Sequence, residues 1–127
     1  MKIRDFKDLE IWKLALLITK QVYDLSAKKE FSRDFGLSNQ IRRAVVSISS
    51  NIVEGFEKSN NNEFIRYLKI AKGSTGEVRN QLEIAKTVGY ITDEELANID
   101  KELIELAAQI GGFIKYLEGQ RKNKFNP

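Results

Sequence analysis

The side chains available for chemistry are carboxylates, lysines, arginines, tyrosines and hydroxyls, because the 127-residue sequence has neither histidine nor cysteine. Without histidine it has no Ser-His-Asp triad and no Glu-x-x-His pair of a di-iron helical bundle. Without cysteine it has no thiolate nucleophile, no disulfide and no cysteine zinc site. We therefore expect a protein that is not an enzyme and that holds no cofactor and no metal.

One glycine-rich stretch, Gly73-Ser74-Thr75-Gly76, invites comparison with a phosphate-binding loop. It lacks the spacing and the trailing lysine of that motif, and it falls in the middle of a segment with helical periodicity. Its small residues instead predict either the close approach of a neighbouring helix or a local irregularity in this one.

A polar stripe interrupts a segment whose other face is strongly apolar. Its members recur three or four residues apart and share one side of a helix: Arg43, Ser47, Ser50 and Glu54, with Asn51 at the edge. Such a stripe could form a ligand site or an interhelical hydrogen-bond network that fixes the register of a bundle. We favour the network, with Arg43 and Glu54 partly buried and paired. The simplest partners from the next segment are Glu77 and Arg79.

Basic side chains offer the other candidate chemistry, although the formal net charge is only +3. Residues 93–118 are predominantly acidic, so the basic charge is concentrated in the rest of the chain. A polyanion could bind that basic surface, or the opposite charges could pair between subunits or remain solvated. No zinc-finger, helix-turn-helix or RNA-recognition signature is present. The nucleic-acid-binding candidates are Lys13, Lys20, Arg42, Arg66, Lys69, Lys72 and Arg79.

Four segments of helical periodicity must position these side chains, and the single proline, Pro127, interrupts none of them. The predicted helices cover about 8–28, from 32–38 to about 55–58, 60–89 and 93–118. The last keeps heptad spacing from Leu96 to Leu117. Short connections make such helices antiparallel neighbours. We predict an all-α fold, an up-down-up-down four-helix bundle over residues 1–119, followed by a flexible basic tail over 120–127.

Helix boundaries are marked by capping residues and glycines. Ser32 could cap the second helix, whereas Asn60 with Glu63 and Thr92 with Glu95 have the spacing of capping boxes at the third and fourth. Glycines are expected to end the last two helices, at Gly89 and Gly119.

The first helix carries two apolar stripes, which together cover more than half of its circumference. A surface helix of a monomeric bundle needs a narrower stripe. We therefore expect a homo-oligomer whose interface includes Ile11, Leu14, Ile18 and Val22. The N-terminal residues lack the apolar core of a signal peptide, and the apolar run 14–18 is too short to cross a bilayer. We expect a cytoplasmic protein with no membrane partner.

Several blocks of the sequence resemble the four-helix-bundle family encoded by bacterial 23S rRNA intervening sequences, sometimes labelled S23 ribosomal protein. The blocks are 6–15 (FKDLEIWKLA), 35–44 (FGLSNQIRRA) with VSI at 46–48 and SNIVEG at 50–55, positions in 64–77, and GYI at 89–91. The resemblance extends over about residues 3–118, and its second block is the most specific. Ser32 and Ser49 stand where the family often carries proline.

This resemblance implies a bundle that assembles into a homopentameric ring. It also implies kinship with the accessory variability protein of diversity-generating retroelements, a basic pentamer taken to bind nucleic acid, and hence a reverse-transcriptase-like protein as a possible partner. Our leading interpretation is a non-enzymatic oligomer that binds structured RNA or DNA through repeated basic surfaces. The alternative is an oligomeric scaffold for another protein, with no nucleic acid involved.

Overall fold

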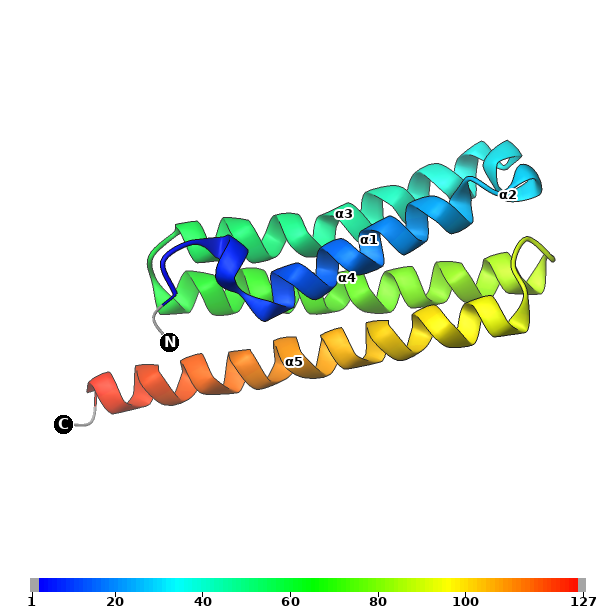
Figure 1. Cartoon of the computed structure of the whole chain (residues 1–127). Helices are drawn as coiled ribbons and strands as arrows, with labels where there is room; N and C mark the ends of the chain where they lie inside the picture. Colours follow the sequence, from blue (N-terminus) through cyan, green and yellow to red (C-terminus); the bar gives the residue numbers. More distant parts are fainter. Residues whose placement is uncertain (1–2, 126–127) are drawn as a thin grey trace.

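Four long helices lie side by side along one axis in the computed structural model, which describes residues 3–125, with side chains over 3–120 (Figure 1). A short 3-10 helix precedes them and a one-turn helix separates the first two. The elements in chain order are η1 (Phe6–Asp8), α1 (Glu10–Ser26), α2 (Lys29–Arg33), α3 (Phe35–Glu57), α4 (Asn61–Thr87) and α5 (Asp93–Phe125). The predicted all-α class is confirmed.

The long helices pack in a closed cycle, with α1 against α3, α3 against α4, α4 against α5 and α5 against α1. Short connections make successive long helices antiparallel (Figure 1). The apolar stripes that the periodicity predicts meet along the axis of this bundle. The largest fully buried side chains on α3, α4 and α5 are Ile41, Ile48, Ile52, Leu68, Leu82, Leu103, Leu106 and Ile110. Each contributes roughly 1.5–3 kcal/mol by leaving water.

The first helix departs from the prediction made for its apolar stripes. Ile11, Ile18 and Val22 are buried in the core of the single chain, and Leu14 is half-buried at its edge. The prediction that this stripe faces another subunit is therefore wrong for the three buried residues. Their burial is possible because α1 is flanked by both α3 and α5.

The other apolar stripe of α1 consists of Leu9, Trp12, Leu16 and Tyr23 and is covered only in part. The ring of Trp12 packs edge-on against Phe6 of η1, with centroids 5.3 Å apart, and Arg42 of α3 lies over the Tyr23 ring. Leu16 and Tyr23 remain 42% and 39% exposed. The contacts of α1 with η1, α2, α3 and α5 thus leave part of this stripe at the surface.

Two of the predicted boundary signals are confirmed in detail, and one is confirmed in part. Thr92 and Glu95 form a complete capping box, and Gly89 ends the α4 region with φ at +88°. Asn60 accepts a hydrogen bond from the Glu63 amide, which is one half of the predicted box. The positive φ at residue 89 costs glycine little and other residues more.

Other boundaries differ from the prediction. Asp34, rather than Ser32, caps α3 by accepting a hydrogen bond from the Leu37 amide at 3.1 Å, and Ser32 lies within α2. The last helix continues through Gly119 to Phe125, so the predicted end near residue 118 is wrong. Its last turns extend beyond the α3–α4 connection (Figure 1). The flexibility predicted for 120–127 is untested, and residues 126–127 lie outside the described part.

The α3–α4 contact depends on one glycine. A Cβ atom added to Gly55 would lie 2.8 Å from Tyr67 Cβ and 2.9 Å from Phe64 Cδ1. The glycines at 73 and 76 behave differently, because an added Cβ would meet nothing within 4 Å at either. The prediction that small residues here admit a neighbouring helix is therefore wrong for the two glycines, whereas Ser74 and Thr75 between them are buried and Ser74 contacts Ser47 of α3. The alternative of a local irregularity is not seen, because α4 runs through this stretch without interruption.

Candidate nucleic-acid interface

Three lysines share a groove between α4 and α5. Lys69 and Lys72 project from α4 and Lys115 projects from α5, and the groove has a volume of about 460 Å³. All three side chains are exposed. Within the described part of the chain none of their ammonium groups has an ion-pair partner. Unpaired ammonium groups in one concave place form a local positive potential, which attracts phosphate oxygens.

Glycine on both walls shapes this groove. Gly73 contributes no side chain from α4, and Gly111 contributes none from α5. A Cβ added to Gly111 would lie 3.6 Å from Lys72 Nζ, so the Lys72 side chain extends across this point of α5. Among the described lining residues, Glu118 is the one carboxylate. In this described part of the groove, three cations therefore face one anion between walls where Gly73 and Gly111 carry no side chain.

The two arginines that sit between helices hold the bundle together. Arg42 Nε donates to Ser26 Oγ at 2.8 Å, and its guanidinium lies 4.5 Å from the centroid of the Tyr23 ring. Arg79 donates two hydrogen bonds to the Asp100 carboxylate, at 2.7 and 3.2 Å. Donating to the Asp100 carboxylate raises the pKa of Arg79. Both guanidinium groups thus hold contacts between helices of this chain, and their role in nucleic-acid binding stays a prediction.

The remaining candidates form exposed pairs along their own helices. Lys13 lies 3.5 Å from Glu10, Lys20 lies 2.8 Å from Asp24, and Arg66 Nε donates to Glu63 at 2.9 Å. The same bond to Glu63 raises the pKa of Arg66. Such exposed pairs contribute up to about 1 kcal/mol, so a phosphate could compete for these cations. Lys13 and Lys20 lie on α1, whereas the lysine groove lies between α4 and α5.

Of the seven sequence candidates, then, only Lys69 and Lys72 share a groove. Lys115 was missed, because it belongs to the segment whose net charge is acidic. Two signals could have identified it: its place near the end of that segment, away from the acidic first turns, and the glycine pair at 111–112 just before it. The acidic residues of α5 are concentrated toward its N-terminal half, and the lysine groove lies at the other end.

The predicted polar network between α3 and α4 exists in a smaller form. Ser47 Oγ and Ser74 Oγ are 3.0 Å apart, and Asn51 Nδ2 donates to the Ser47 hydroxyl at 3.0 Å and to the Ser47 carbonyl at 2.8 Å. Ser74 is buried, and the sequence interpretation did not include it as a partner. This cluster links the two helices by side-chain hydrogen bonds.

Four members assigned to that network lie at the surface instead: Arg43, Ser50, Glu54 and Glu77. Glu54 pairs with Lys58 at 3.5 Å, not with Arg43. The predicted burial and pairing of Arg43 and Glu54 is thus wrong for the single chain. Arg43 and Ser50 instead border a hollow of about 520 Å³ beside Tyr23, which keeps the ligand-site interpretation of this stripe open.

The described residues bear on two other kinds of site, a metal centre and a membrane-spanning helix. No group of three or more acidic, histidine or cysteine side chains there could hold a metal ion. None of the helices in the same part of the chain combines the length and the apolar composition that crossing a membrane requires.

The chain is similar in sequence to one protein family and in structure to a solved protein. The sequence model of one family, the 23S rRNA-intervening sequence proteins, matches residues 7–112. A solved structure from Bacteroides thetaiotaomicron, described as a protein with unknown function from the S23 ribosomal protein family, is similar with a TM-score of 0.76 and 26% identity. The similarity covers 83% of this chain and 98% of that one. No curated protein matches. The chain belongs to the 23S rRNA-intervening sequence protein family.

Proposed function

We propose that this protein binds structured RNA or DNA without catalysing a reaction, and that the lysine groove between α4 and α5 holds the phosphate backbone. The observation that carries this proposal is the convergence of Lys69, Lys72 and Lys115 on a groove with a glycine on each wall, none of the three being paired with a described carboxylate. Contacts of this kind recognise phosphate and not base sequence. Binding should therefore be weakly sequence-specific and strongly dependent on salt.

We further propose that the chain acts as a ring-shaped homopentamer in the cytoplasm, which would present the groove five times. Exposed apolar side chains on three helices support association: Leu16 on α1, Val46 on α3, and Ile70 and Ile84 on α4, each 40–43% exposed. These residues replace the buried α1 stripe as interface candidates. Repetition matters because the affinity for a polyanion rises steeply with the number of phosphates contacted. A reverse-transcriptase-like protein remains a proposed partner.

The same exposed apolar side chains favour the second function, an oligomeric scaffold for another protein. A scaffold needs a docking surface and no phosphate site. The two functions differ in one measurable respect, because the scaffold predicts no nucleic-acid binding above background and no effect of the groove lysines.

The test is a fluorescence-anisotropy titration against a structured RNA, duplex DNA and an RNA–DNA hybrid at 50 mM salt. The groove variant is Lys69→Gln/Lys72→Gln/Lys115→Gln. The control removes the same charge from three exposed lysines on η1, α2 and α5 that are not binding candidates: Lys7→Gln/Lys29→Gln/Lys101→Gln. We expect the groove variant to lose at least about tenfold in affinity and the control to lose less than about threefold, because only local cations neutralise the bound phosphates.

Two results would count against nucleic-acid binding through this groove. Equal losses in both variants would mean that net charge, and not the groove, attracts the polyanion. No binding by the wild type below roughly 0.1 mM at 50 mM salt, where even non-specific binders register, would favour the scaffold. Circular dichroism and light scattering on each variant would show that fold and oligomeric state are unchanged.

A further inference from the structure

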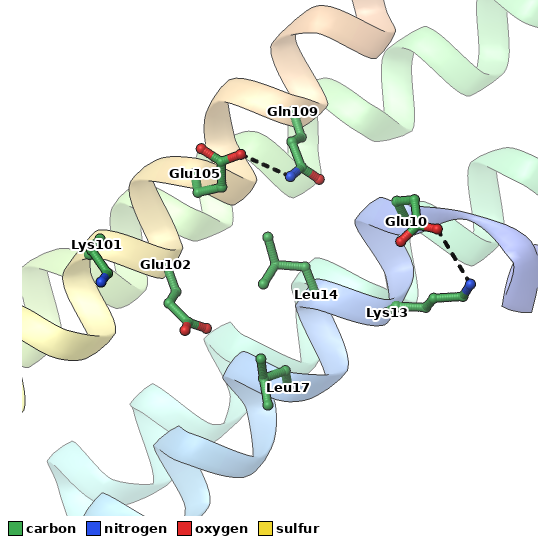
Figure 2. A pocket seen from close by; sticks show the side chains of 8 residues that line it. All are labelled: Glu10, Lys13, Leu14, Leu17, Lys101, Glu102, Glu105 and Gln109. Atoms are coloured by element: carbon green, nitrogen blue, oxygen red, sulfur yellow. Dashed lines mark hydrogen bonds and ion pairs between the residues drawn. The ribbon is translucent and has the colours of Figure 1, made fainter.

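A second groove runs along the bundle between α1 and α5 and is separate from the lysine groove between α4 and α5. Its main hollow has a volume of about 870 Å³, and a smaller hollow of about 230 Å³ lies between later residues of α1 and earlier residues of α5. Figure 2 shows Leu14 and Glu102 extending from opposite walls into the main hollow. The α1–α5 seam is also the least closely packed of the four seams between long helices. The bundle is thus open along this edge.

The spacing of the lining residues suits a helical occupant. The α5 wall is formed by residues three and four apart: Glu95, Asn98, Glu102, Glu105 and Gln109. The α1 wall repeats the same spacing over Glu10, Leu14, Leu17, Gln21 and Asp24. Alternating steps of three and four keep a row of side chains facing a neighbouring helix. Each row spans about 21 Å at 1.5 Å per residue, which is four turns of a helix.

The two walls differ in chemistry. Leu17 on the α1 wall is 48% exposed, and Leu14 is half-buried beside it. The α5 wall of the main hollow carries the carboxylates of Glu102 and Glu105 and the ammonium group of Lys101. The α1 wall also carries Glu10 and Lys13, which pair with each other. A helix lying between these walls would bury an apolar seam against the leucines and present polar groups to the carboxylates.

Two side chains of this groove have an acceptor atom without a hydrogen-bond donor among the described residues. Among the described side chains, three buried oxygen atoms have no hydrogen-bond partner, and two of them belong to this groove: Glu102 Oε2 and Gln21 Oε1. A buried acceptor without a donor is costly, and a carboxylate is best satisfied by a cationic donor. The Glu102 side chain also lines the main hollow, where a lysine or arginine of the occupant can supply a donor to its carboxylate.

We infer that the α1–α5 groove docks a cationic amphipathic helix of a partner protein. Its apolar seam packs on Leu14 and Leu17, and its lysines or arginines donate hydrogen bonds to Glu102 and Glu105. Charge separates this groove from the lysine groove, because carboxylates on the α5 wall repel phosphate and attract a basic helix. The inference is independent of the proposed nucleic-acid binding, because the two sites share no residue.

The probe is a fluorescent synthetic helix of about 15 residues, long enough for the groove at 1.5 Å per residue, with leucines at heptad spacing and lysines elsewhere. Its control peptide has glutamate in place of every lysine. Binding of each peptide to the full chain is followed by fluorescence anisotropy. We expect the basic peptide to bind with an affinity that falls as salt increases, and the acidic peptide not to bind.

Two variants test whether the basic peptide binds in the α1–α5 groove. Glu102→Gln/Glu105→Gln keeps the side-chain size and should weaken basic-peptide binding about tenfold or more, because charged hydrogen-bond partners are lost. Leu17→Ser should weaken it without removing charge. The matched control, Glu94→Gln/Ile104→Ser, changes an exposed carboxylate and an exposed apolar residue of α5 that do not line the groove, and should leave the affinity within twofold.

Three results would overturn the inference: binding of both peptides alike, equal effects of the control and groove variants, or no binding of the basic peptide. So would a result that assigns the groove to a second copy of this chain. In that case Leu17→Ser would dissociate the protein's own oligomer in light scattering, and the intact oligomer would exclude the peptide. Circular dichroism of each variant shows that the bundle is folded, so a loss of binding is attributable to the groove.

Discussion

Replacing Gly55 by alanine should destabilise the bundle, even though alanine is the better helix former. The new Cβ would lie 2.8 Å from Tyr67 Cβ, 2.9 Å from Phe64 Cδ1 and 3.3 Å from Phe64 Cα. Two of these atoms are fixed to the backbone of α4, so α3 and α4 would have to move apart. Overpacking costs about 1–3 kcal/mol. The contacts under 3 Å place this site in the upper part of that range, at about 2–3 kcal/mol, and the gain in helix propensity returns roughly 1 kcal/mol. We expect a net loss of about 1–2 kcal/mol.

Gly76→Ala is the matched control for this substitution. Gly76 is an exposed residue inside α4, and an added Cβ there meets nothing within 4 Å. The same chemical change should therefore stabilise the protein by about 0.5–1 kcal/mol, because alanine loses less backbone entropy than glycine on folding. The assay is urea unfolding followed by circular dichroism at one fixed protein concentration, since association shifts apparent stability. If Gly55→Ala matched or exceeded the wild type, the close α3–α4 approach would be refuted.

Three other predictions follow from the contacts. Ile18→Glu should unfold the chain rather than merely dissociate it, because Ile18 is 0% exposed in the core; a folded monomer by circular dichroism would contradict this. Arg42→Ala should lower the free energy of unfolding by roughly 1–2 kcal/mol because Arg42 holds α3 to α1, whereas the exposed Arg43→Ala should change it by less than about 0.5 kcal/mol. Hydrogen bonds from Lys28 and from the Thr92 amide lower the pKa of Glu95 from its ordinary value of 4.5. The ionised Glu95 carboxylate therefore stabilises the fold above pH 4.5, and this stabilisation is lost as pH falls through the lowered pKa. The free energy of unfolding of Glu95→Gln should lack this pH-dependent part.

The helices and the core could be predicted from the sequence because both follow from local pattern. Heptad spacing in α5 identified Leu103, Leu106 and Ile110 as core, and Thr92 with Glu95 identified the start of that helix. Glycine was a weaker signal, because Gly119 lies inside α5 and a helix interior tolerates glycine at a modest cost. The one-turn helix α2 has too few residues to show a period.

The partners of the α1 stripe and of the polar stripe could not be predicted in the same way. Periodicity shows that Ile18 needs burial, but not whether another helix of the same chain or another subunit buries it. In the polar stripe, Ser47 faces α4 and finds Ser74, whereas Arg43 and Glu54 lie at the surface. Helix spacing assigns a residue to a face of the helix only to within about a quarter of a turn. A shift of that size decides whether a side chain contacts the neighbouring helix or faces solvent.

Lys115 of the candidate site could not be predicted from the sequence either. Net charge assigned its helix to the acidic part of the protein, although Lys115 lines the lysine groove with Lys69 and Lys72. Two of the predicted arginines, Arg42 and Arg79, proved to be interhelical contacts. Electrostatic sites depend on which charges converge and which are already paired, and both require the packing of the helices to be known.

The salt dependence of binding to duplex DNA tests the central claim most directly. Log affinity is measured against log salt for the wild type and for Lys69→Gln/Lys72→Gln/Lys115→Gln. Each lysine–phosphate contact contributes about 0.9 to the slope, so loss of three contacts at one groove should reduce its magnitude by about 2.7, and by more if several subunits hold the same duplex. A variant with the wild-type slope, or a wild type that does not bind, would contradict the assignment of the lysine groove as the phosphate-binding surface.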